Sequence, residues 1–187
     1  MAGLRKANAY SKRKITPFTR TSKRRQKSFI KVVPPQKIVK FQMGQVSETE
    51  KFPHLLTVVS TELVQLRHNA MEACRQYVNK KLDKELSGLY AFKIIPYPHH
   101  IQREHKMLTG AGADRMSSGM QLSFGKSVGK AAVLKKESVM FLIWLPTEKS
   151  VVFTRKVLKQ IKSKLPGAFR VDYSKNVVKA KVKPKAK

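Results

Sequence analysis

Residues 138–173 decide the fold and read SVMFLIWLPTEKSVVFTRKVLKQIKSKLPGAFRVDY. The apolar run at 138–145 predicts a buried strand, and Thr147 after the proline predicts a helix N-cap. The apolar face of the helix recurs at steps of three and four: Val151, Thr154, Leu158, Ile161 and Leu165. Pro166-Gly167 ends the helix, and residues 168–173 predict a last strand. The stretch therefore predicts strand, helix and strand in succession.

The chain before this stretch repeats the pattern. Further strands are predicted at 29–33, 37–43, 55–59, 90–97 and 128–134. Helical periodicity falls between the third and fourth of these. The order of elements predicts an α+β fold in which two helices pack on one face of a mixed, mostly antiparallel sheet.

The first helix is expected to begin at Ser60 or Thr61 and to end near Leu86, with Ser87-Gly88 as its stop. Its predicted apolar face is Leu63, Leu66, Ala70, Ala73 and Tyr77. Cys74 lies beside that face, where it is most simply a small core residue.

Residues 98–127 contain four glycines and no sustained hydrophobic period, which predicts a long, mostly irregular loop. Loops of this length inside a compact domain are usually functional or disordered. Arg103, His105, Lys106 and Arg115 flank the segment 109–114. Because glycines allow close approach and cations attract phosphates, contact with RNA is favoured over a surface loop of no consequence.

The charge is strongly one-sided: 40 Lys and Arg oppose 11 Asp and Glu, which gives a net charge of +29. Residues 1–47 hold 13 basic residues and no acid, and six lysines follow Asp172 without an acid. We therefore expect a basic arm at 1–28, one folded domain at 29–173 and a Lys-rich tail at 174–187. Such a charge predicts a polyanionic partner, because a folded chain this basic repels itself.

Several classes of protein are excluded by composition. A single cysteine excludes internal disulfides and Cys-rich zinc sites. The longest apolar run is Val139 to Leu145, far shorter than the roughly 20 residues of a membrane span, and no secretory signal fits. An acid-free N-terminus also suits an organelle transit peptide, but the matching basic tail makes targeting alone a poor explanation.

No motif supports an enzyme. Gly125-Lys126-Ser127 lacks the glycine that a phosphate-binding loop needs six residues before the lysine, where Met120 stands. Gly110 and Gly112 supply only part of a dinucleotide-binding fingerprint. His99, His100 and His105 cluster without metal-ligand spacing, and next to RNA such histidines more often stack or contact phosphates. We predict no catalytic residue, no metal and no cofactor.

Residues 97–116, YPHHIQREHKMLTGAGADRM, with Gly119-Met120, Phe124-Gly-Lys126, Gly129 and Ala131-Ala-Val133, closely resemble a known signature. It belongs to the archaeal and eukaryotic branch of universal large-subunit ribosomal protein sixteen. Val33-Pro34, Lys37-Ile38, Met43-Gly44 and the helical segment 65–73 also look like that family. The resemblance spans about residues 29–173 and is nearest to archaeal members.

The resemblance implies an α+β fold with a hammerhead-like β element, and a structural constituent of the large ribosomal subunit. It implies binding to large-subunit rRNA near the aminoacyl-tRNA site, support of tRNA positioning, neighbouring large-subunit proteins as partners, and a cytoplasmic location. Neither a membrane nor homo-oligomerisation is expected. The loop facing the tRNA and the peptidyl transferase centre would contain Arg103, Glu104, His105, Lys106, Met107, Thr109, Gly110, Ala111, Gly112, Asp114 and Arg115.

The other expected RNA contacts are basic or aromatic residues of the arm and of the folded domain. They are Arg5, Lys6, Tyr10, Lys12, Arg13, Lys14, Arg20, Lys23, Arg24, Arg25, Lys27, Arg67, His68, His99, His100, Lys126 and Lys130. The chain departs from many relatives at Ser127, where they have proline, and in its basic arm and tail.

Two other hypotheses stay open at this point. A DNA-compacting or general nucleic-acid chaperone would bind duplex DNA as well as structured RNA and would not need residues 98–127. A small RNA-modifying enzyme with a basic tether would need a cofactor site, and the sequence shows no credible one.

Overall fold

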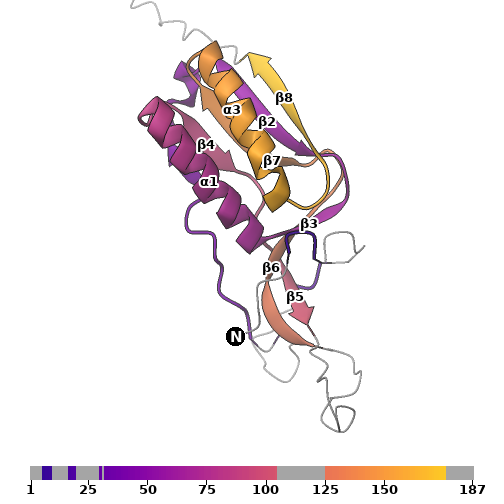
Figure 1. Ribbon diagram of the computed structural model, residues 1–187. Helices are drawn as coiled ribbons and strands as arrows, with labels where there is room; N and C mark the ends of the chain where they lie inside the picture. The colour runs from indigo at the N-terminus through magenta and orange to yellow at the C-terminus, as the bar shows by residue number, and fades with distance from the viewer. Residues whose placement is uncertain (1–5, 10–16, 20–29, 31, 105–124, 176–187) are drawn as a thin grey trace, which may run out of the picture.

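The computed structural model describes residues 6–9, 17–19, 30, 32–104 and 125–175. It shows a layer of two α-helices on one face of a five-stranded sheet, with a separate three-stranded sheet at one end (Figure 1). The predicted α+β class is confirmed. The single predicted sheet is divided into two sheets, and all strand pairings in the described chain are antiparallel.

The large sheet has the strand order β1-β4-β7-β2-β8. Its strands are β1 (Gln42–Gly44), β2 (His54–Ser60), β4 (Ala91–Ile94), β7 (Val139–Leu145) and β8 (Phe169–Lys175). The strands β2, β4, β7 and β8 confirm the predicted segments to within a few residues. β7 is the central strand, with Phe141, Ile143 and Leu145 fully buried and Leu142 and Trp144 half-buried, whereas β1 and β8 form the edges.

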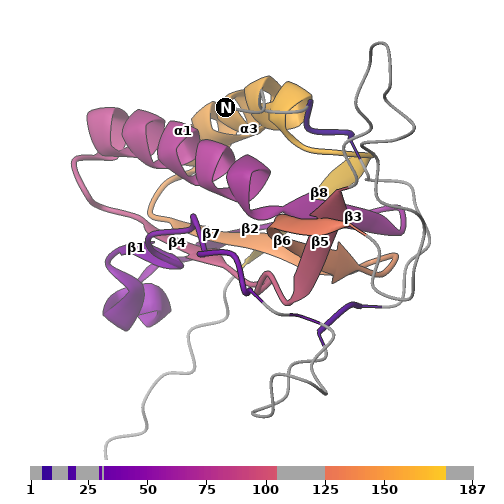
Figure 2. The ribbon, with the colours of Figure 1, turned by 90° about the horizontal axis from the view of Figure 1, so that it is seen from below.

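Two α-helices, α1 (His68–Leu86) and α3 (Glu148–Gln160), lie side by side on one face of the large sheet (Figures 1 and 2). A 3-10 helix, η3 (Ile161–Lys164), continues α3, and another, η2 (Val46–Lys51), follows β1. Among the described residues, neither helix is long and apolar enough to cross a bilayer.

The second predicted helix is confirmed almost residue by residue. Thr147 is the N-cap: its Oγ1 accepts from the Ser150 amide at 3.3 Å, and Ser150 Oγ accepts from the Thr147 amide at 3.2 Å, which is a capping box. The predicted apolar face of α3 and η3 is buried. The cap and the final Pro166-Gly167 mark both ends clearly in the sequence.

The first helix begins later than predicted, at His68 rather than at Ser60 or Thr61. Val64–Arg67 instead form strand β3, which pairs with residues 131–134. Of the predicted face, Leu66 and Ala70 are buried, Ala73 and Tyr77 are only half-buried, and Leu63 lies before the helix and is exposed. The buried apolar residues of the helix are Ala70, Met71, Cys74, Val78 and Leu82. The predicted end at Leu86 is confirmed, because Ser87 takes a left-handed conformation with φ 47°.

The hydrophobic core fills the space between the helices and the large sheet. Phe92 and Phe141 meet edge to face with ring centroids 5.7 Å apart, and both are fully buried. The core continues through Val64, Leu66 and Leu134 into the base of the small sheet. One continuous apolar cluster therefore joins the two sheets.

The small sheet has the order β3-β6-β5, with β6 at Lys126–Leu134 and β5 at His100–Glu104. The prediction of a mostly irregular segment at 98–127 is therefore wrong at both ends, because β5 and the start of β6 lie within it. The polar sequence of β5 carries no alternating hydrophobic signal. Pairing with β6, rather than local propensity, makes it a strand.

The two predicted N-terminal strands are corrected. Residues 30 and 32–41 form no strand among those described, and only Gln42–Gly44 pair, with β4. Pro34-Pro35 cannot donate backbone hydrogen bonds, so this segment cannot continue a ladder. Ile38 is nevertheless buried in the core. The apolar residues of this segment therefore indicate packing against the core and not pairing with another strand.

Candidate nucleic-acid interface

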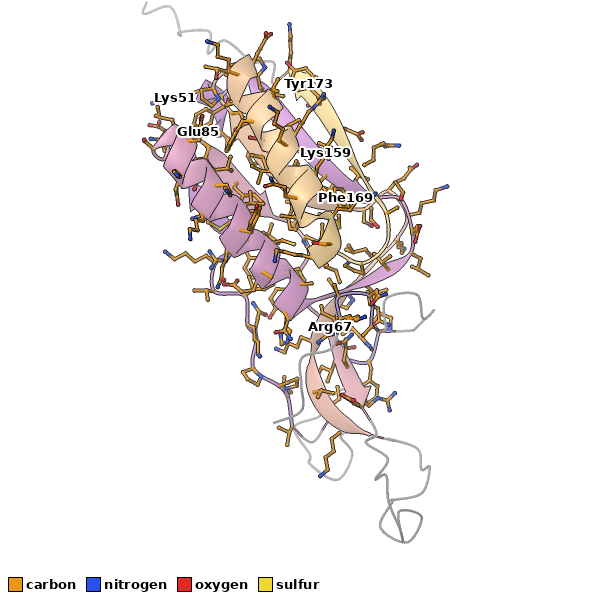
Figure 3. All side chains as sticks on the ribbon, in the orientation of Figure 1. Lys51, Arg67, Glu85, Lys159, Phe169 and Tyr173 are labelled. Carbon is orange, nitrogen blue, oxygen red and sulfur yellow. The ribbon has the colours of Figure 1, made fainter. Side chains whose placement is uncertain are left out.

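Predicted RNA-contacting residues come together where the small sheet meets α1. The chain passes from β3 into α1 at Arg67 and His68 without a connecting loop, and Figure 3 labels Arg67 at this junction. Arg67 Nη1 donates to the carbonyl oxygen of Lys6 at 3.3 Å. Lys37 and Lys130 lie close enough to perturb the ionisation of His68. The junction therefore gathers residues from four distant parts of the chain.

His68 is enclosed by this cluster, with only 3% of its surface exposed. Burial, and then the charges of Lys37, Arg67 and Lys130, lower the pKa of His68 to about 4. Its Nε2 lies only 3.0 Å from the place where a β-carbon on Gly129 would stand. The ring is thus a neutral packing element that needs glycine opposite it. Direct contact of His68 with RNA stays a prediction.

His100 holds a piece of the N-terminal arm. Its ring is 4% exposed, and Nδ1 accepts from the Phe18 amide at 2.8 Å. The Ile101 amide donates to the Phe18 carbonyl oxygen at 3.1 Å, so Phe18 is bound along the edge of β5. Burial first, and then His99 and Arg103, lower the pKa of His100. Neutral His100 has a free lone pair on Nδ1 for this bond, whereas the imidazolium does not.

Arg103 and Glu104, predicted in the functional loop, belong to β5 instead. The Arg103 guanidinium carbon lies 3.9 Å from the centroid of the Phe18 ring, which is cation–π distance. Arg103 is exposed beyond this contact and keeps donors available. His99 is also exposed, with Nδ1 3.0 Å from the Tyr97 carbonyl oxygen.

A buried amide pair ties the outer strands of the small sheet together. Gln102 Nε2 on β5 donates to Gln65 Oε1 on β3 at 3.1 Å, and both side chains are buried. Buried amides are costly unless they are hydrogen-bonded, so this pair fixes the relative position of the two strands.

The surface of the small sheet is basic. Lys126 and Arg103 are exposed, and Arg67 and Lys130 are half-exposed. Glu104 is the single acidic residue in the three strands. Lysine and arginine at these positions can meet backbone phosphates, and the guanidinium can do so with two parallel hydrogen bonds.

The other predicted contacts lie outside the described residues. In the arm these are Arg5, Tyr10, Lys12, Arg13, Lys14, Arg20, Lys23, Arg24, Arg25 and Lys27. In the loop they are His105, Lys106, Met107, Thr109, Gly110, Ala111, Gly112, Asp114 and Arg115.

Two sets of basic residues were missed by the sequence analysis. Lys37 adds to the junction, but it lies in a segment that was interpreted only as a strand. Lys149, Arg155, Lys156 and Lys159 are exposed on α3. The sequence pattern could have indicated them, because they occupy the side of the predicted helix opposite its apolar face.

Neither metal nor thiol chemistry is indicated. In the described part of the chain, no three His, Cys, Asp or Glu side chains form a group that could hold a metal ion. Cys74 is fully buried, and burial raises the pKa of its thiol to about 12. It is a core residue, as predicted, and not a nucleophile.

Comparison with known proteins gives the family. The model of the family "Ribosomal protein L16p/L10e" matches residues 17–172. The chain is 45% identical over 141 residues to the large ribosomal subunit protein uL16 of Methanoculleus marisnigri, covering 74% of this chain and 81% of the relative. It is 38% identical to the uL16 of Archaeoglobus fulgidus, over 80% and 82% of the two chains.

A more distant relative is matched over a greater length. The uL16 of Sulfolobus acidocaldarius is 37% identical over 175 residues, which cover 91% of this chain and 94% of the relative. The match includes the small sheet and both helices. The chain belongs to the L16p/L10e family of ribosomal proteins and is of the archaeal type.

Proposed function

We propose that this chain binds large-subunit rRNA beside the aminoacyl-tRNA site through the small sheet and the N-terminal arm, and thereby supports tRNA positioning. Its family makes it a structural constituent of the large ribosomal subunit in the cytoplasm, with rRNA and ribosomal proteins as partners, and not an enzyme.

The observation that carries the proposal is the gathering of cations at the junction of β3, β6 and α1. Arg67 directly precedes the buried His68, and Lys37 and Lys130 lie near enough that their charges lower the pKa of its ring. Cations this close together repel one another unless an anion lies between them, and an RNA backbone supplies anions at regular spacing. The folded surface would supply shape, which is how structured RNA is mostly recognised.

The arm at 1–28 and the tail at 174–187 would add sequence-independent affinity, because each neutralised phosphate releases counterions. Phe18 on β5 places part of the arm beside Arg103. We infer that residues 98–127, at the end of this sheet, face the tRNA and the peptidyl transferase centre. The protein would act as a single copy among neighbouring large-subunit proteins rather than as a homo-oligomer.

A native lysate, washed at about 0.5 M salt and sedimented, tests the assignment as a whole. Binding through phosphates alone should largely dissociate at that salt. We expect the protein to travel with the large subunit at near one copy. Recovery at the top of the gradient, or with DNA, would refute this and favour the chaperone hypothesis.

Arg103→Ala tests the role in tRNA positioning. We expect subunits with this variant to assemble normally but to bind aminoacyl-site tRNA several-fold more weakly. Phe18→Ala is the matched control, because it removes the same ring contact and leaves the cation in place. Equal tRNA affinity in wild-type and Arg103→Ala subunits would refute the role, and an equal loss in both variants would assign it to arm docking instead.

A further inference from the structure

We propose that the outward side of α3 and η3 is a second RNA-binding surface that takes the phosphate backbone of an rRNA segment other than the one at the small sheet. The surface, called here the α3 basic face, comprises Lys149, Arg155, Lys156, Lys159, Lys162 and Lys164. The inference rests on the proposed function and extends it to a part of the molecule that the sequence analysis left without a role.

The geometry of α3 makes this face one-sided. Val151, Thr154 and Leu158 turn toward the core and are buried. With 100° per residue, Lys156 and Lys159 fall on the side of the helix away from the core and Arg155 lies next to them, and all three are exposed. The amphipathic pattern that fixes the helix to the sheet therefore also gathers its cations on the solvent side.

Among the described residues, no carboxylate forms an ion pair with these cations. Glu148, in the first turn, is the single acid from the start of α3 to Val171. The ion pairs found in the described chain join Lys51 to Glu48, Arg75 to Glu72, and Arg170 to Asp172, so none of them includes a cation of the α3 basic face. The face therefore keeps its full positive charge.

On the neighbouring helix, α1, acidic residues do lie among the basic ones. On α1, Glu72 receives two hydrogen bonds from Arg75, at 2.6 and 2.8 Å. Lys80, Lys81 and Lys84 are followed or interrupted by Asp83 and Glu85. The two helices lie side by side in the same layer (Figure 1), yet only in α3 and η3 are the cations after the first turn uninterrupted by acids.

Aromatic rings position the edges of the face. The ammonium groups of Lys164 and Lys81 lie 5.8 and 5.9 Å from the centroid of the Tyr77 ring. The Tyr77 hydroxyl donates to Gln160 Oε1 at 2.6 Å, which holds the ring between α1 and α3. Cation–π contacts restrict the lysine head groups in advance, so less side-chain entropy is lost when they bind an anion.

The charge pattern favours RNA over an acidic protein. A phosphodiester strand is uniformly negative, which matches a face of six cations without acids. Protein surfaces usually intersperse both signs. Figure 3 labels Lys159 on the helix layer and Arg67 at the small-sheet junction, so the two basic surfaces occupy different parts of the molecule. The protein would therefore join two RNA segments.

The test compares two triple variants of the full chain that lose the same charge. Arg155→Gln/Lys156→Gln/Lys159→Gln alters the α3 basic face. Lys80→Gln/Lys84→Gln/Lys136→Gln removes three exposed lysines elsewhere. The affinity of each for a transcript of archaeal large-subunit rRNA is measured from about 0.1 to 0.4 M salt, after urea unfolding has shown that both variants are folded.

We expect the α3 triple variant to reduce the slope of log affinity against log salt by about 2, since three phosphate contacts contribute roughly 0.7–0.9 each. The control should change it by less than about 0.5. An equal change in both variants, or none in the α3 variant, would overturn the inference. Normal rRNA binding with loss of the α3 variant from large subunits would overturn it in favour of a protein partner.

The proposed function fails in a different way. If the wild-type chain itself does not bind the transcript above its affinity for duplex DNA of equal length, rRNA recognition is refuted whatever the α3 variants do. If wild type binds and only Lys126→Gln/Lys130→Gln weakens it, the small-sheet surface stands and the α3 inference alone is refuted. When the α3 and small-sheet variants are combined, their reductions in the slope of log affinity against log salt should add. Additive reductions support two separate contacts.

Discussion

The two sheets of this protein are held together in opposite ways. The large sheet and its helices enclose aromatic and aliphatic side chains such as Phe92, Phe141 and Leu56, all fully buried. The outer part of the small sheet depends on polar contacts: the Gln65–Gln102 amide pair, the neutral His68, and the bond from Phe18 to His100. Apolar burial needs no partner, whereas buried polar groups among cations depend on pH and on nearby anions.

The difference suggests a division of labour within one chain. The large sheet would supply a body that needs no RNA for its stability. Under the proposed function, the small sheet would place charges for RNA at the cost of local stability. Four measurements test whether the two sheets differ in this way.

Phe141→Ala should give the largest loss. It removes a fully buried ring that packs on Phe92, so the free energy of unfolding in urea should fall by about 3–5 kcal/mol. Val152→Ala, at an exposed position of α3, should change it by less than about 0.5 kcal/mol. Similar losses from both would mean that the large sheet is not the main source of stability.

The pH dependence of stability comes next and tests His68. Its pKa is about 4 in the folded chain against 6.5 when unfolded, so the unfolded state binds more protons between these values. Neutral His68 therefore contributes fully to the free energy of unfolding above pH 6.5. This contribution is lost as the pH falls toward 4, by up to about 3 kcal/mol. His68→Gln should flatten this part of the unfolding profile. If the profile of His68→Gln were as steep as that of wild type, His68 would not be the cause of this pH dependence.

The amide pair predicts a smaller effect. Gln102→Leu removes the donor to Gln65 Oε1 and should lower the free energy of unfolding by about 1–2 kcal/mol. In a double-mutant cycle, Gln65→Leu/Gln102→Leu should cost clearly less than the sum of the single changes. Strict additivity would show that the two amides do not stabilise each other.

The docked arm predicts the smallest effect. Phe18→Ala removes the contact with Arg103, which is worth about 0.5–1 kcal/mol at an exposed site. Exchange of the Ile101 amide hydrogen should speed up by about fivefold at most, while the urea midpoint stays unchanged. A shift of the midpoint would show that the small sheet and its arm contact are part of the cooperative core.

The sequence predicted correctly those elements whose ends and faces are marked by neighbouring residues. Thr147 caps α3, its apolar face has a clean period, and proline and glycine follow it, so the helix was placed correctly. The start of α1 was placed wrongly, because Leu66 in β3 and Ala70 in α1 are four residues apart, which is also the spacing of one helical face. Only pairing with β6, far along the chain, makes Val64–Arg67 a strand.

The candidate site was predicted in composition but not in arrangement. The sequence analysis listed Arg67, His68, His100 and Lys130 among the expected RNA contacts, and their contact with RNA stays a prediction. The structure places Arg67, His68 and Lys130 at one junction. The sequence could not show that both histidines are buried, since burial of a polar ring depends on neighbours such as Gly129 and Phe18. The cations of α3 were overlooked because exposed lysines on a helix are common and were not weighed as a group.

The direct passage from β3 into α1 leaves no loop that could absorb a movement of the small sheet. With 19 residues at 1.5 Å each, α1 extends about 28 Å from His68, and Met71, Cys74, Val78 and Leu82 hold it in the core along that length. A force on the small sheet would therefore be carried through the helix into the body, as far as Glu85 at the other end (Figure 3). The protein would move on its RNA as one rigid piece rather than as two hinged parts.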